Sequence, residues 1–313
     1  MTIDPPIATW MLQTPGAPGP IGIIQIDGDV DGAFARLGIE PVATGDVRLR
    51  RIAGVDTGIV ARWTDSCAHL MPHAGPAVMR AITRRLDDAG LARATRATWP
   101  EARDQFESRM LDALARAASP LAINLLLDQP RRWRDRVANP DPALDATLSR
   151  LIDPPLVVAI GAPNIGKSTL ANTLSGRSVA IVADVPGTTR DHVGVAIDVA
   201  GLVVNYVDTP GIAPPATDID REAAAIAADL VSRADLVLRC FDHAGVPPPS
   251  VGPASLALAL RLDLGPAGRP CDVGVSALTR QGIDDLARAI RERLVPDAAL
   301  TDPRPWQFWP ERE

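Results

Sequence analysis

The pattern G-x-x-x-x-G-K-S at residues 161–168 constrains this chain more than any other feature of its sequence. Residues 156–160 before it are rich in valine and isoleucine and predict a buried strand of a parallel sheet. Residues 170–174 after it predict the opening turns of a helix. A phosphate-binding loop requires this order of strand, glycine-containing loop and helix N-terminus. The chain is therefore predicted to contain a nucleotide-binding domain.

Each residue type in this loop has a physical role. Gly161 and Gly166 let backbone N–H groups face a phosphate. Lys167 would reach the β- and γ-phosphates and so act in catalysis, and the Ser168 hydroxyl would bind Mg²⁺. The predicted nucleotide contacts of the loop are Asn164, Ile165, Gly166, Lys167, Ser168 and Thr169.

Two polar stretches follow the loop at spacings of a few tens of residues. Residues 183–191 read A-D-V-P-G-T-T-R-D, and a hydroxyl there would complete the Mg²⁺ shell, although alone such a stretch is more often a polar loop. Residues 203–211 predict a strand that ends in Asp208, which would hold Mg²⁺ through water, followed by Gly211, whose N–H would sense the γ-phosphate. Three motifs in this order predict a P-loop GTPase.

These two stretches supply the second group of predicted site residues. The predicted nucleotide contacts are Ala183, Asp184, Val185, Gly187, Thr188, Thr189, Asp208, Thr209, Pro210 and Gly211. Among them, Thr189 and Gly211 are also predicted to be catalytic, beside Lys167.

A guanine pocket is predicted less completely. Its usual N-K-x-D pattern has Leu260 in place of Asn and Arg261 in place of Lys, but it keeps Asp263. Asp263 is either the reader of guanine N1–H and the 2-amino group or a helix-capping residue. Ser276 and Ala277 match a fifth loop, where a backbone N–H meets the guanine oxygen. We therefore expect a weakened preference for guanine.

Composition limits the remaining possibilities. The net charge of −6 argues against a surface that binds nucleic acid non-specifically. Cys67, Cys240 and Cys271 are far apart, which predicts reduced thiols and no zinc site. No apolar run approaches the roughly 18 residues of a membrane span, so we expect a cytoplasmic protein without a membrane partner.

The 313 residues predict a multidomain α/β and α+β chain. Short strands and late helices predict a small α+β domain over residues 1–95, and apolar residues at helical spacing predict a helical segment over residues 96–152. Alternating strand and helix patterns predict a doubly wound, mostly parallel sheet over residues 153–296, and residues 297–313 form a short tail.

Three groups of residues outside these motifs have alternative interpretations. His69 and His73 are expected to shape a loop rather than bind a metal, since acidic or cysteine partners do not cluster with them in the sequence. Trp306 and Trp309 are expected to pack the tail, with docking on a partner as the alternative. A basic run is expected to be a solvated helix face, with tRNA contact as the weaker alternative: Arg131, Arg132, Arg134 and Arg136.

These motifs resemble the MnmE (TrmE) family of tRNA-modification GTPases. The resemblance rests on G-x-P-N-x-G-K-S at residues 161–168, P-G-T-T-R-D at 186–191 and D-T-P-G at 208–211. Weaker matches are T-P-G followed by G-P-I-G-I-I at residues 14–24, H-A-G-P at 73–76 and F-E-S-R-M at 106–110. The resemblance covers roughly residues 5–295.

The resemblance implies a folate-binding-like N-terminal domain that dimerises, a helical domain and an inserted G domain. It implies GTP and GDP as ligands, a folate derivative in the N-terminal domain, and tRNA or a tRNA-modification protein as partner. It also implies activation by K⁺, which Asn164 and the carbonyls of Ala183, Val185 and Thr188 would hold. Mg²⁺ would be bound by Ser168, Thr189 and Asp208.

The chain departs from the family pattern at two places. The family has a glutamate soon after D-T-x-G that positions the attacking water, whereas the first acid after Gly211 is Asp218. The family's C-x-G-K motif is also absent from the sequence. One hypothesis is a slow, K⁺-assisted GTPase linked to tRNA wobble-uridine modification. The alternative is a nucleotide-binding interaction module that does not hydrolyse GTP, and a ribosome-assembly GTPase is a third, fainter option.

Overall fold

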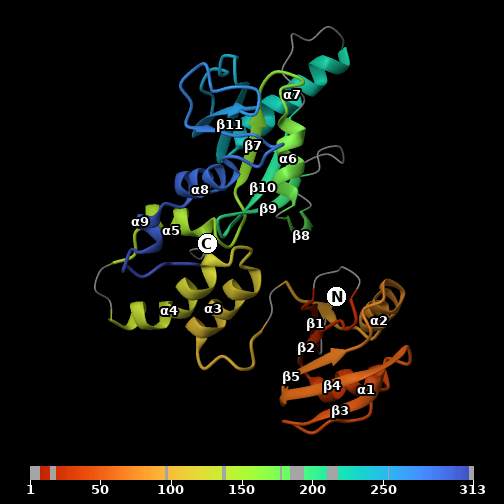
Figure 1. Ribbon diagram of the computed structural model, residues 1–313. Helices are drawn as coiled ribbons and strands as arrows, with labels where there is room; N and C mark the ends of the chain where they lie inside the picture. Colours follow the sequence, from red (N-terminus) through yellow and green to blue (C-terminus); the bar gives the residue numbers. More distant parts are fainter. Residues whose placement is uncertain are drawn as a thin grey trace. The chain divides into compact units, whose positions relative to one another are not determined.

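The structure is a computed structural model that describes residues 8–14, 19–95, 98–135, 139–176, 178–183, 194–209, 218–252 and 254–309, with the backbone alone at residues 175, 178–183 and 218–224. It divides into two compact units, Met1–Asp112 and Ala113–Glu313 (Figure 1). The boundary lies within helix α3, Gln105–Arg116. The division into four parts by sequence stays a prediction.

The first unit is an α+β fold around one sheet with strand order β3-β4-β5-β2-β1-β6. Its neighbours pair antiparallel, except that β1 and β6 run parallel. The strands are β1 Ala8–Leu12, β2 Ile24–Gly28, β3 Val47–Ile52, β4 Asp56–Thr64, β5 Cys67–Met71 and β6 Ala92–Arg93. The helices are α1 Val30–Leu37 and α2 Pro76–Asp88.

One face of this sheet carries the core of the first unit. Alternation along β2 points Ile24 and Ile26 to that face, where both are fully buried. Phe34 of α1 and Leu86 of α2 belong to the same buried cluster. Burying large apolar side chains from two helices against one sheet face is the main stabilising term of such a unit.

The other face is polar near β2 and apolar near β3. Gln25 is 1% exposed, and its amide donates to the Thr98 carbonyl at 2.9 Å. Towards the edge strand β3, by contrast, large apolar side chains meet solvent. In register, Leu49 of β3 lies opposite Ile59 of β4. We call the exposed group the open apolar face, and its residues are Val47, Leu49, Ile59 and Trp63, exposed by 54%, 66%, 38% and 48%.

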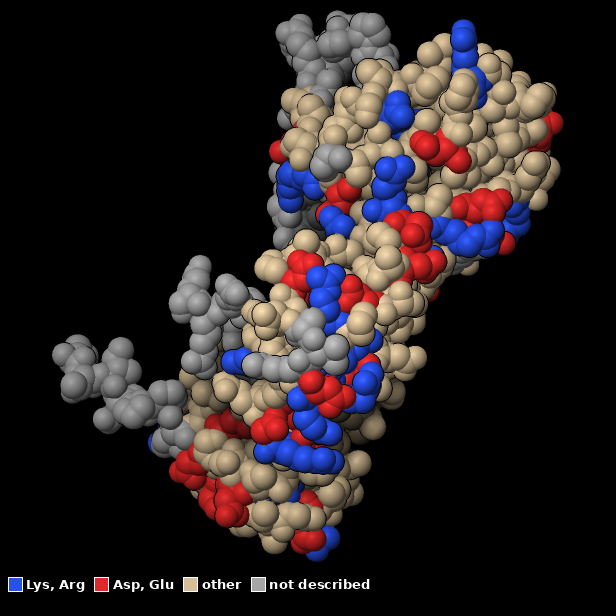
Figure 2. Space-filling model, turned by 90° about the vertical axis from the view of Figure 1, so that its left-hand side faces the viewer, with Lys and Arg blue, Asp and Glu red and all other residues tan. Residues whose placement is uncertain are grey.

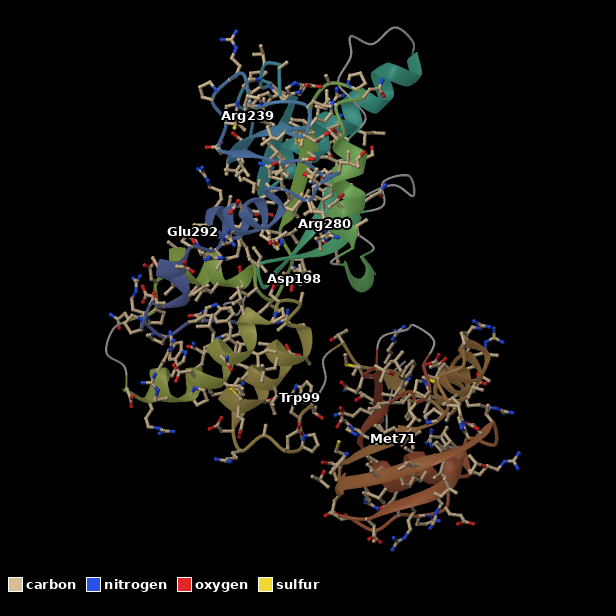
Figure 3. The ribbon with its side chains drawn as sticks, viewed as in Figure 1. Met71, Trp99, Asp198, Arg239, Arg280 and Glu292 are labelled. Atoms are coloured by element: carbon tan, nitrogen blue, oxygen red, sulfur yellow. The ribbon has the colours of Figure 1, made fainter. Side chains whose placement is uncertain are left out.

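The structure corrects the expected loop position of His69. This residue lies inside β5, whose end is marked by Met71 in Figure 3, and its Nδ1 accepts a hydrogen bond from Trp63 Nε1 at 2.9 Å. Burial lowers the pKa of His69. His73 does lie between elements, with its Nδ1 3.0 Å from Asp56 Oδ2. The sequence of β5, C-A-H-L-M, does not alternate between polar and apolar residues, so period-two alternation could not identify this strand.

The second unit begins with helices. They are the end of α3, α4 Leu121–Asp135 and α5 Pro142–Ser149. Ser119, which is 1% exposed before α4, accepts a hydrogen bond at its Oγ from the Val203 N–H at 2.9 Å. Val203 follows the turn at Ala200 and Gly201, where the Gly201 N–H donates to Asp198 at 2.7 Å (Figure 3). The helical segment is thus hydrogen-bonded to the hairpin between β9 and β10.

The rest of the second unit is a seven-stranded sheet with order β13-β12-β11-β7-β10-β9-β8. The strands from β13 to β10 in this order run parallel, and β10, β9 and β8 pair antiparallel. The mostly parallel, doubly wound sheet predicted from the sequence is confirmed. The strands are β7 Leu156–Ile160, β8 Ser178–Ala183, β9 Gly194–Val199, β10 Leu202–Asp208, β11 Leu236–Asp242, β12 Ser255–Leu260 and β13 Val273–Gly274. The helices are α6 Lys167–Ser175, α7 Asp218–Arg233, α8 Ile283–Leu294 and α9 Asp297–Leu300.

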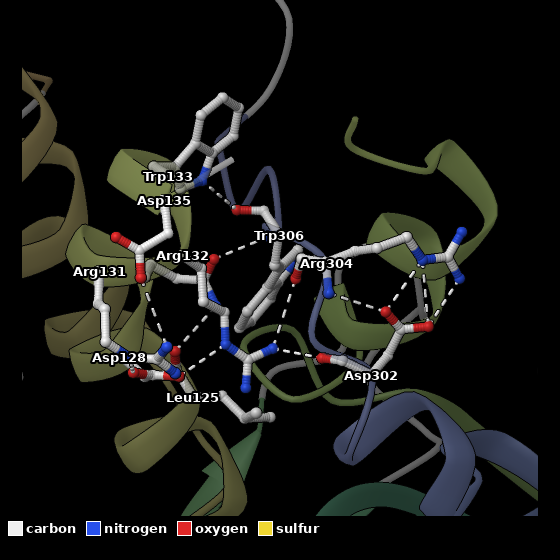
Figure 4. Close-up of polar contacts among 10 residues, drawn as sticks. Leu125, Asp128, Arg131, Arg132, Trp133, Asp135, Asp302, Arg304 and Trp306 are labelled. Atoms are coloured by element: carbon white, nitrogen blue, oxygen red, sulfur yellow. Dashed lines mark hydrogen bonds and ion pairs between the residues drawn. The ribbon is translucent and has the colours of Figure 1, made fainter. Parts of the chain in front are cut away.

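Residues 302–309 after α9, which we call the C-terminal strap, pack onto α4 and α5 (Figure 4). Trp306 is fully buried, and its N–H donates to Gln129 Oε1 at 2.8 Å. The Trp306 carbonyl accepts from Trp133 Nε1 at 3.1 Å. The expectation of a packed tail therefore holds for Trp306, because its side chain is fully buried and its backbone N–H and carbonyl are both hydrogen-bonded to α4.

The strap also overturns the expected solvated face for part of the basic run. Arg132 donates from Nη1 to the carbonyls of Asp302 and Arg304, and its side chain is only 12% exposed. A buried carbonyl needs a donor, and an arginine on the facing helix provides one. Arg131 is 63% exposed and fits the expectation, whereas Arg136 lies outside the described residues.

Two aspartates at the junction of α5 and the strap should respond to pH with opposite signs. Burial raises the pKa of Asp145, whose Oδ1 accepts from the Gln307 N–H at 2.9 Å. A raised folded pKa adds stability at low pH, and that stability is lost as the pH rises through it. Asp145→Asn keeps the acceptor without the charge, so we expect its urea midpoint at pH 7 to exceed that of the parent. The gain in the free energy of unfolding at pH 7 should be about 0.5 kcal/mol after solvent screening. This gain should shrink towards pH 4.

Asp141→Asn is the matched control. The Ala143 N–H and then Arg304 hold the pKa of Asp141 below its ordinary value, so its contribution is present at neutral pH and lost as the pH falls. This variant should be less stable than the parent at pH 7, and the deficit should disappear in acid. Circular dichroism at each pH measures both variants. Shifts of the same sign in the two variants would contradict the assignment.

Candidate nucleotide-binding site

The backbone of the glycine-containing loop can be formed only with glycine at its first position. Gly161 follows the fully apolar strand β7 with φ of 154°. A Cβ there would lie 2.3 Å from the carbonyl oxygen of Cys240 on the neighbouring strand β11. Gly166, with φ of 101°, is the N-cap of α6. The loop therefore turns directly from the sheet into a helix N-terminus, which is the geometry that binds phosphate.

Lys167 lies inside this turn. It is 6% exposed, and its Nζ donates to the carbonyls of Gly161 and Ala162 at 3.1 and 2.8 Å. An ammonium group held at this place by the loop's own carbonyls stands where phosphate oxygens would arrive. Asn164 is exposed and has a left-handed φ of 61°. Ile165 is buried beneath the loop, at 8% exposure.

Ser168 in the first turn of α6 and Asp208 at the end of β10 come together. Register pairs Asp208 of β10 with Ala159 of β7, and the Ser168 hydroxyl donates to Asp208 Oδ2 at 2.8 Å. Asp208 Oδ1 is buried and lacks a hydrogen-bond partner among the described residues. Hydroxyl and carboxylate oxygens are the ligands that Mg²⁺ prefers, and an unpartnered carboxylate oxygen needs a cation or water. This pair therefore fits Mg²⁺.

The groups behind the loop are neutral. Burial raises the pKa of the Cys240 thiol to about 12 and raises the pKa of the fully buried Tyr206. Thr209 is 2% exposed and donates from Oγ1 to the Ala159 carbonyl at 2.8 Å, so it holds the end of β10 against β7. A protonated Cys240 is neither a metal ligand nor a nucleophile. Cys240 and Tyr206 therefore add no charge behind the loop.

The predicted base-recognition residues also come together. Asp263 Oδ1 accepts a hydrogen bond from Ser276 Oγ at 2.6 Å, and Ser276 is fully buried. The Ser276 N–H bonds to the Gln281 carbonyl at 3.0 Å and closes the loop that carries Arg280, labelled in Figure 3. The helix-capping alternative for Asp263 is wrong, because the next helix in the described chain is α8, which begins at Ile283.

The loop that carries Ser276 and Ala277 is linked to α6, the helix that contains Thr169. The Thr173 hydroxyl donates to the carbonyls of Thr169 and Ala277 at 2.9 and 3.4 Å. Leu260, where the base-recognition pattern has Asn, is 2% exposed. It ends β12 as an apolar core residue and offers no polar side-chain atom to a base.

Several predicted residues lie outside the described part of the chain. They are Asp184, Val185, Gly187, Thr188, Thr189, Pro210 and Gly211. Ala183 ends β8 with only its backbone described. Their roles, including the potassium ligands and the Mg²⁺ ligand Thr189, stay predictions.

Sequence reasoning missed Asp242. This residue ends β11, lies in register with Leu260, and forms an ion pair with Arg261 at 3.1 Å. An acid at the end of an apolar strand next to the loop strand is a recognisable signal, since parallel strands present their carboxyl ends at one edge. The described residues contain no cluster of three or more potential metal-ligating side chains.

A glycine-containing turn into a helix N-terminus, a hydroxyl–carboxylate pair that fits Mg²⁺ and a mostly parallel sheet define the class of the second unit as a P-loop GTPase fold. The family model for 50S ribosome-binding GTPases matches residues 156–261. The tRNA modification GTPase MnmE of Acidiphilium cryptum is 33% identical over 276 residues, which are 85% of this chain and 61% of that protein. MnmE of Methylobacterium radiotolerans is 42% identical over 179 residues, which are 53% of this chain and 39% of that protein. The chain is MnmE-like.

The extent of these matches is limited. The chain spans about three fifths of the Acidiphilium cryptum relative, 61% of its length. A solved structure of Era in complex with MgGDPNP and nucleotides 1506-1542 of 16S ribosomal RNA is 26% identical, covers 45% of this chain and 56% of that one, and has a TM-score of 0.36. Within the described residues, each helix is too short or too polar to cross a membrane.

Replacing Ser168 should show whether this residue acts in nucleotide binding through Mg²⁺. Ser168→Ala removes the hydroxyl that donates to Asp208, so nucleotide affinity in Mg²⁺ should fall about tenfold or more while affinity in EDTA changes little. Fluorescence titration with a labelled GDP measures both. Ser232→Ala, whose hydroxyl bonds to a carbonyl of its own helix α7, is the control. An equal loss with and without Mg²⁺ would exclude Ser168 as a metal ligand.

Proposed function

We propose that the chain binds GTP and GDP with Mg²⁺ and hydrolyses GTP slowly with the help of K⁺. The observation that carries this proposal is the Ser168–Asp208 pair at 2.8 Å, next to a loop in which Lys167 is buried. Ser168, Asp208 and water would hold Mg²⁺, which supplies charge stabilisation to the transferred phosphoryl group. Lys167 would bind phosphate oxygens, and the N–H groups at the start of α6 would orient them.

Guanine is the base that the site supports best. The Asp263 carboxylate can accept from both the N1–H and the 2-amino group of guanine, whereas adenine offers neither donor at these positions. The hydroxyl of buried Ser276 fixes Asp263 from behind at 2.6 Å. Because Leu260 supplies no polar atom, discrimination against ATP should be smaller than in a site with the complete N-K-x-D pattern.

Potassium assistance rests on Asn164 and on the family resemblance. The Asn164 side chain is exposed at the loop, so its amide oxygen is accessible to a cation beside the phosphates. A monovalent cation there would neutralise charge that develops between the phosphates, as an arginine finger does. The carbonyls of Ala183, Val185 and Thr188 would complete its shell.

The test is nucleotide binding and turnover with GTP, GDP and ATP, first in K⁺ and then in Na⁺ at matched ionic strength. We expect GTP hydrolysis to be faster in K⁺, and we expect Asn164→Ala to abolish that difference while binding of GDP persists. Equal rates in both salts would exclude K⁺ assistance. Tight GTP binding without turnover would favour the interaction module, consistent with the lack of an acid between Gly211 and Asp218. Lack of binding would overturn the proposed function.

The names of the relatives suggest the setting of this activity. Both compared MnmE proteins are named tRNA modification GTPases, and we place the chain in the same cytoplasmic process, with tRNA or a tRNA-modification protein as partner. On the face drawn in Figure 2, acidic and basic side chains are interspersed, so that view adds no basic patch in support. A folate derivative in the first unit belongs to the same family-based proposal.

Homodimerisation through the first unit has support from the structure. The open apolar face places Val47, Leu49, Ile59 and Trp63 together on two paired strands, and exposed apolar clusters of this kind mark association surfaces. A second copy would cover the same residues, since two-fold interfaces are self-complementary. Because β3 is an edge strand, association also protects it from unspecific pairing.

Leu49→Glu tests this interface. It places a charge in the centre of the open apolar face, and we expect dimer affinity, measured by analytical ultracentrifugation, to fall about a hundredfold. Leu127→Glu is the matched control, because Leu127 of α4 is exposed to a similar degree, 55% against 66% for Leu49. If the unsubstituted chain sediments as a monomer, or if both variants behave alike, the open apolar face is not the dimer interface.

A further inference from the structure

Arg261 extends from the end of β12 across the phosphate loop, residues 161–168. It follows Leu260 at the end of β12 and has a left-handed φ of 61°. Its Cγ and Cδ lie 3.7 and 3.8 Å from the position that a Cβ on Gly166 would take. The apolar stem of Arg261 therefore lies over the last glycine of the loop, within van der Waals reach of a Cβ at position 166.

The guanidinium of Arg261 has two partners on different elements. Nη1 donates to the carbonyl of Asn164 in the phosphate loop at 3.3 Å. Nη2 lies 3.1 Å from Asp242 Oδ2 at the end of β11. A planar fork can satisfy both partners at once, whereas a lysine ammonium on a flexible stem is not oriented in this way.

Asp242 is itself held firmly. Its backbone pairs in register with Leu260, and its carbonyl accepts from the Gly245 N–H at 2.7 Å. Its Oδ1 accepts from the Ala244 N–H at 3.3 Å and lies 2.6 Å from His243 Nδ1. The carboxylate is therefore a fixed point on the sheet, at 24% exposure, against which the mobile end of an arginine side chain can be oriented.

Leu260, which precedes Arg261, does not provide a polar link to the phosphate loop. Leu260 is buried and apolar, so it cannot hydrogen-bond the phosphate loop as a side-chain amide at that position would. Among the described side chains of β12 and its following turn, residues 255–264, the hydrogen bond to the phosphate loop is that from Arg261 to Asn164.

We propose that Asp242 is a positioning residue for nucleotide binding. It orients the guanidinium of Arg261, which keeps the stem of Arg261 over Gly166 and its second arm on the Asn164 carbonyl. The ion pair thereby holds the turn that carries Asp263 at a fixed distance from the loop that binds the phosphates. This inference rests on the proposed function, since it concerns the same nucleotide site.

The proposal has a signature that a general loss of stability would not produce. If Asp242 fixes the distance between the phosphates and Asp263, its removal should misplace Asp263 against the base. The preference for GDP over IDP, which lacks the 2-amino group, should then shrink along with the affinity. A variant that merely unfolds more easily would bind both nucleotides less well by the same factor.

Asp242→Asn and Arg261→Lys test the proposal in competition titrations against labelled GDP. We expect each variant to bind GDP about tenfold more weakly, with a faster release, and to show a smaller ratio of IDP to GDP dissociation constants. The double variant should be no worse than either single one, because both changes break one interaction. Asp128→Asn, which breaks the Arg132 ion pair on α4 at 30% exposure, is the control and should keep wild-type affinity.

The outcomes separate this inference from the proposed function. Wild-type GDP affinity and an unchanged IDP-to-GDP ratio in Asp242→Asn would overturn the role of Asp242 and leave the nucleotide site intact. Additive losses in the double variant would show that Asp242 and Arg261 act separately, which also overturns it. Lack of GDP binding by the unsubstituted chain would overturn both. Thermal unfolding without nucleotide, compared among the variants and Asp128→Asn, shows whether each one folds.

Discussion

The close approach of two backbones at Gly161 is the constraint on which the nucleotide site depends. A side chain there would collide with the Cys240 carbonyl at 2.3 Å, so β7 and β11 can remain neighbours only if the chain turns at a glycine. That turn starts α6 and buries Lys167. Because β10, β7, β11 and β12 run parallel, their last residues meet at one edge, and this edge collects Asp208, the loop, Asp242 and Leu260.

Charge at this edge is distributed between two acids with different tasks. Asp208 faces the Ser168 hydroxyl and keeps one buried oxygen without a partner among the described residues, as a metal site requires. Asp242 instead pairs with an arginine and accepts from a backbone N–H, which makes it a structural anchor. The same residue type, placed at the ends of strands on either side of β7, thus keeps an oxygen available for a cation in one place and pairs with a cationic side chain in the other.

Local signals in the sequence were sufficient for the phosphate loop, because its glycines, lysine and hydroxyl are set by contacts within a few residues. Asp263 and Ser276 could also be predicted, since a strand end and a loop at fixed order define them. Arg132 was predicted wrongly because its partners lie about 170 residues away in the strap, and a run of arginines alone indicates a solvated face. Asp242 was missed although its position at a strand end is a recognisable signal, because the motif-based interpretation did not consider the partner that Arg261 offers at the end of the next strand.

The hydrogen bond from Val203 to Ser119 means that β10 joins two parts of the second unit. Near its start, the strand is attached to the helical segment, and its last residue carries the Asp208 carboxylate. A strand is a nearly inextensible rod that spans about 3.3 Å per residue. Because β10 also pairs with β7 and β9 along its length, it forms a short and stiff connection between the residues before α4 and the carboxylate beside Ser168.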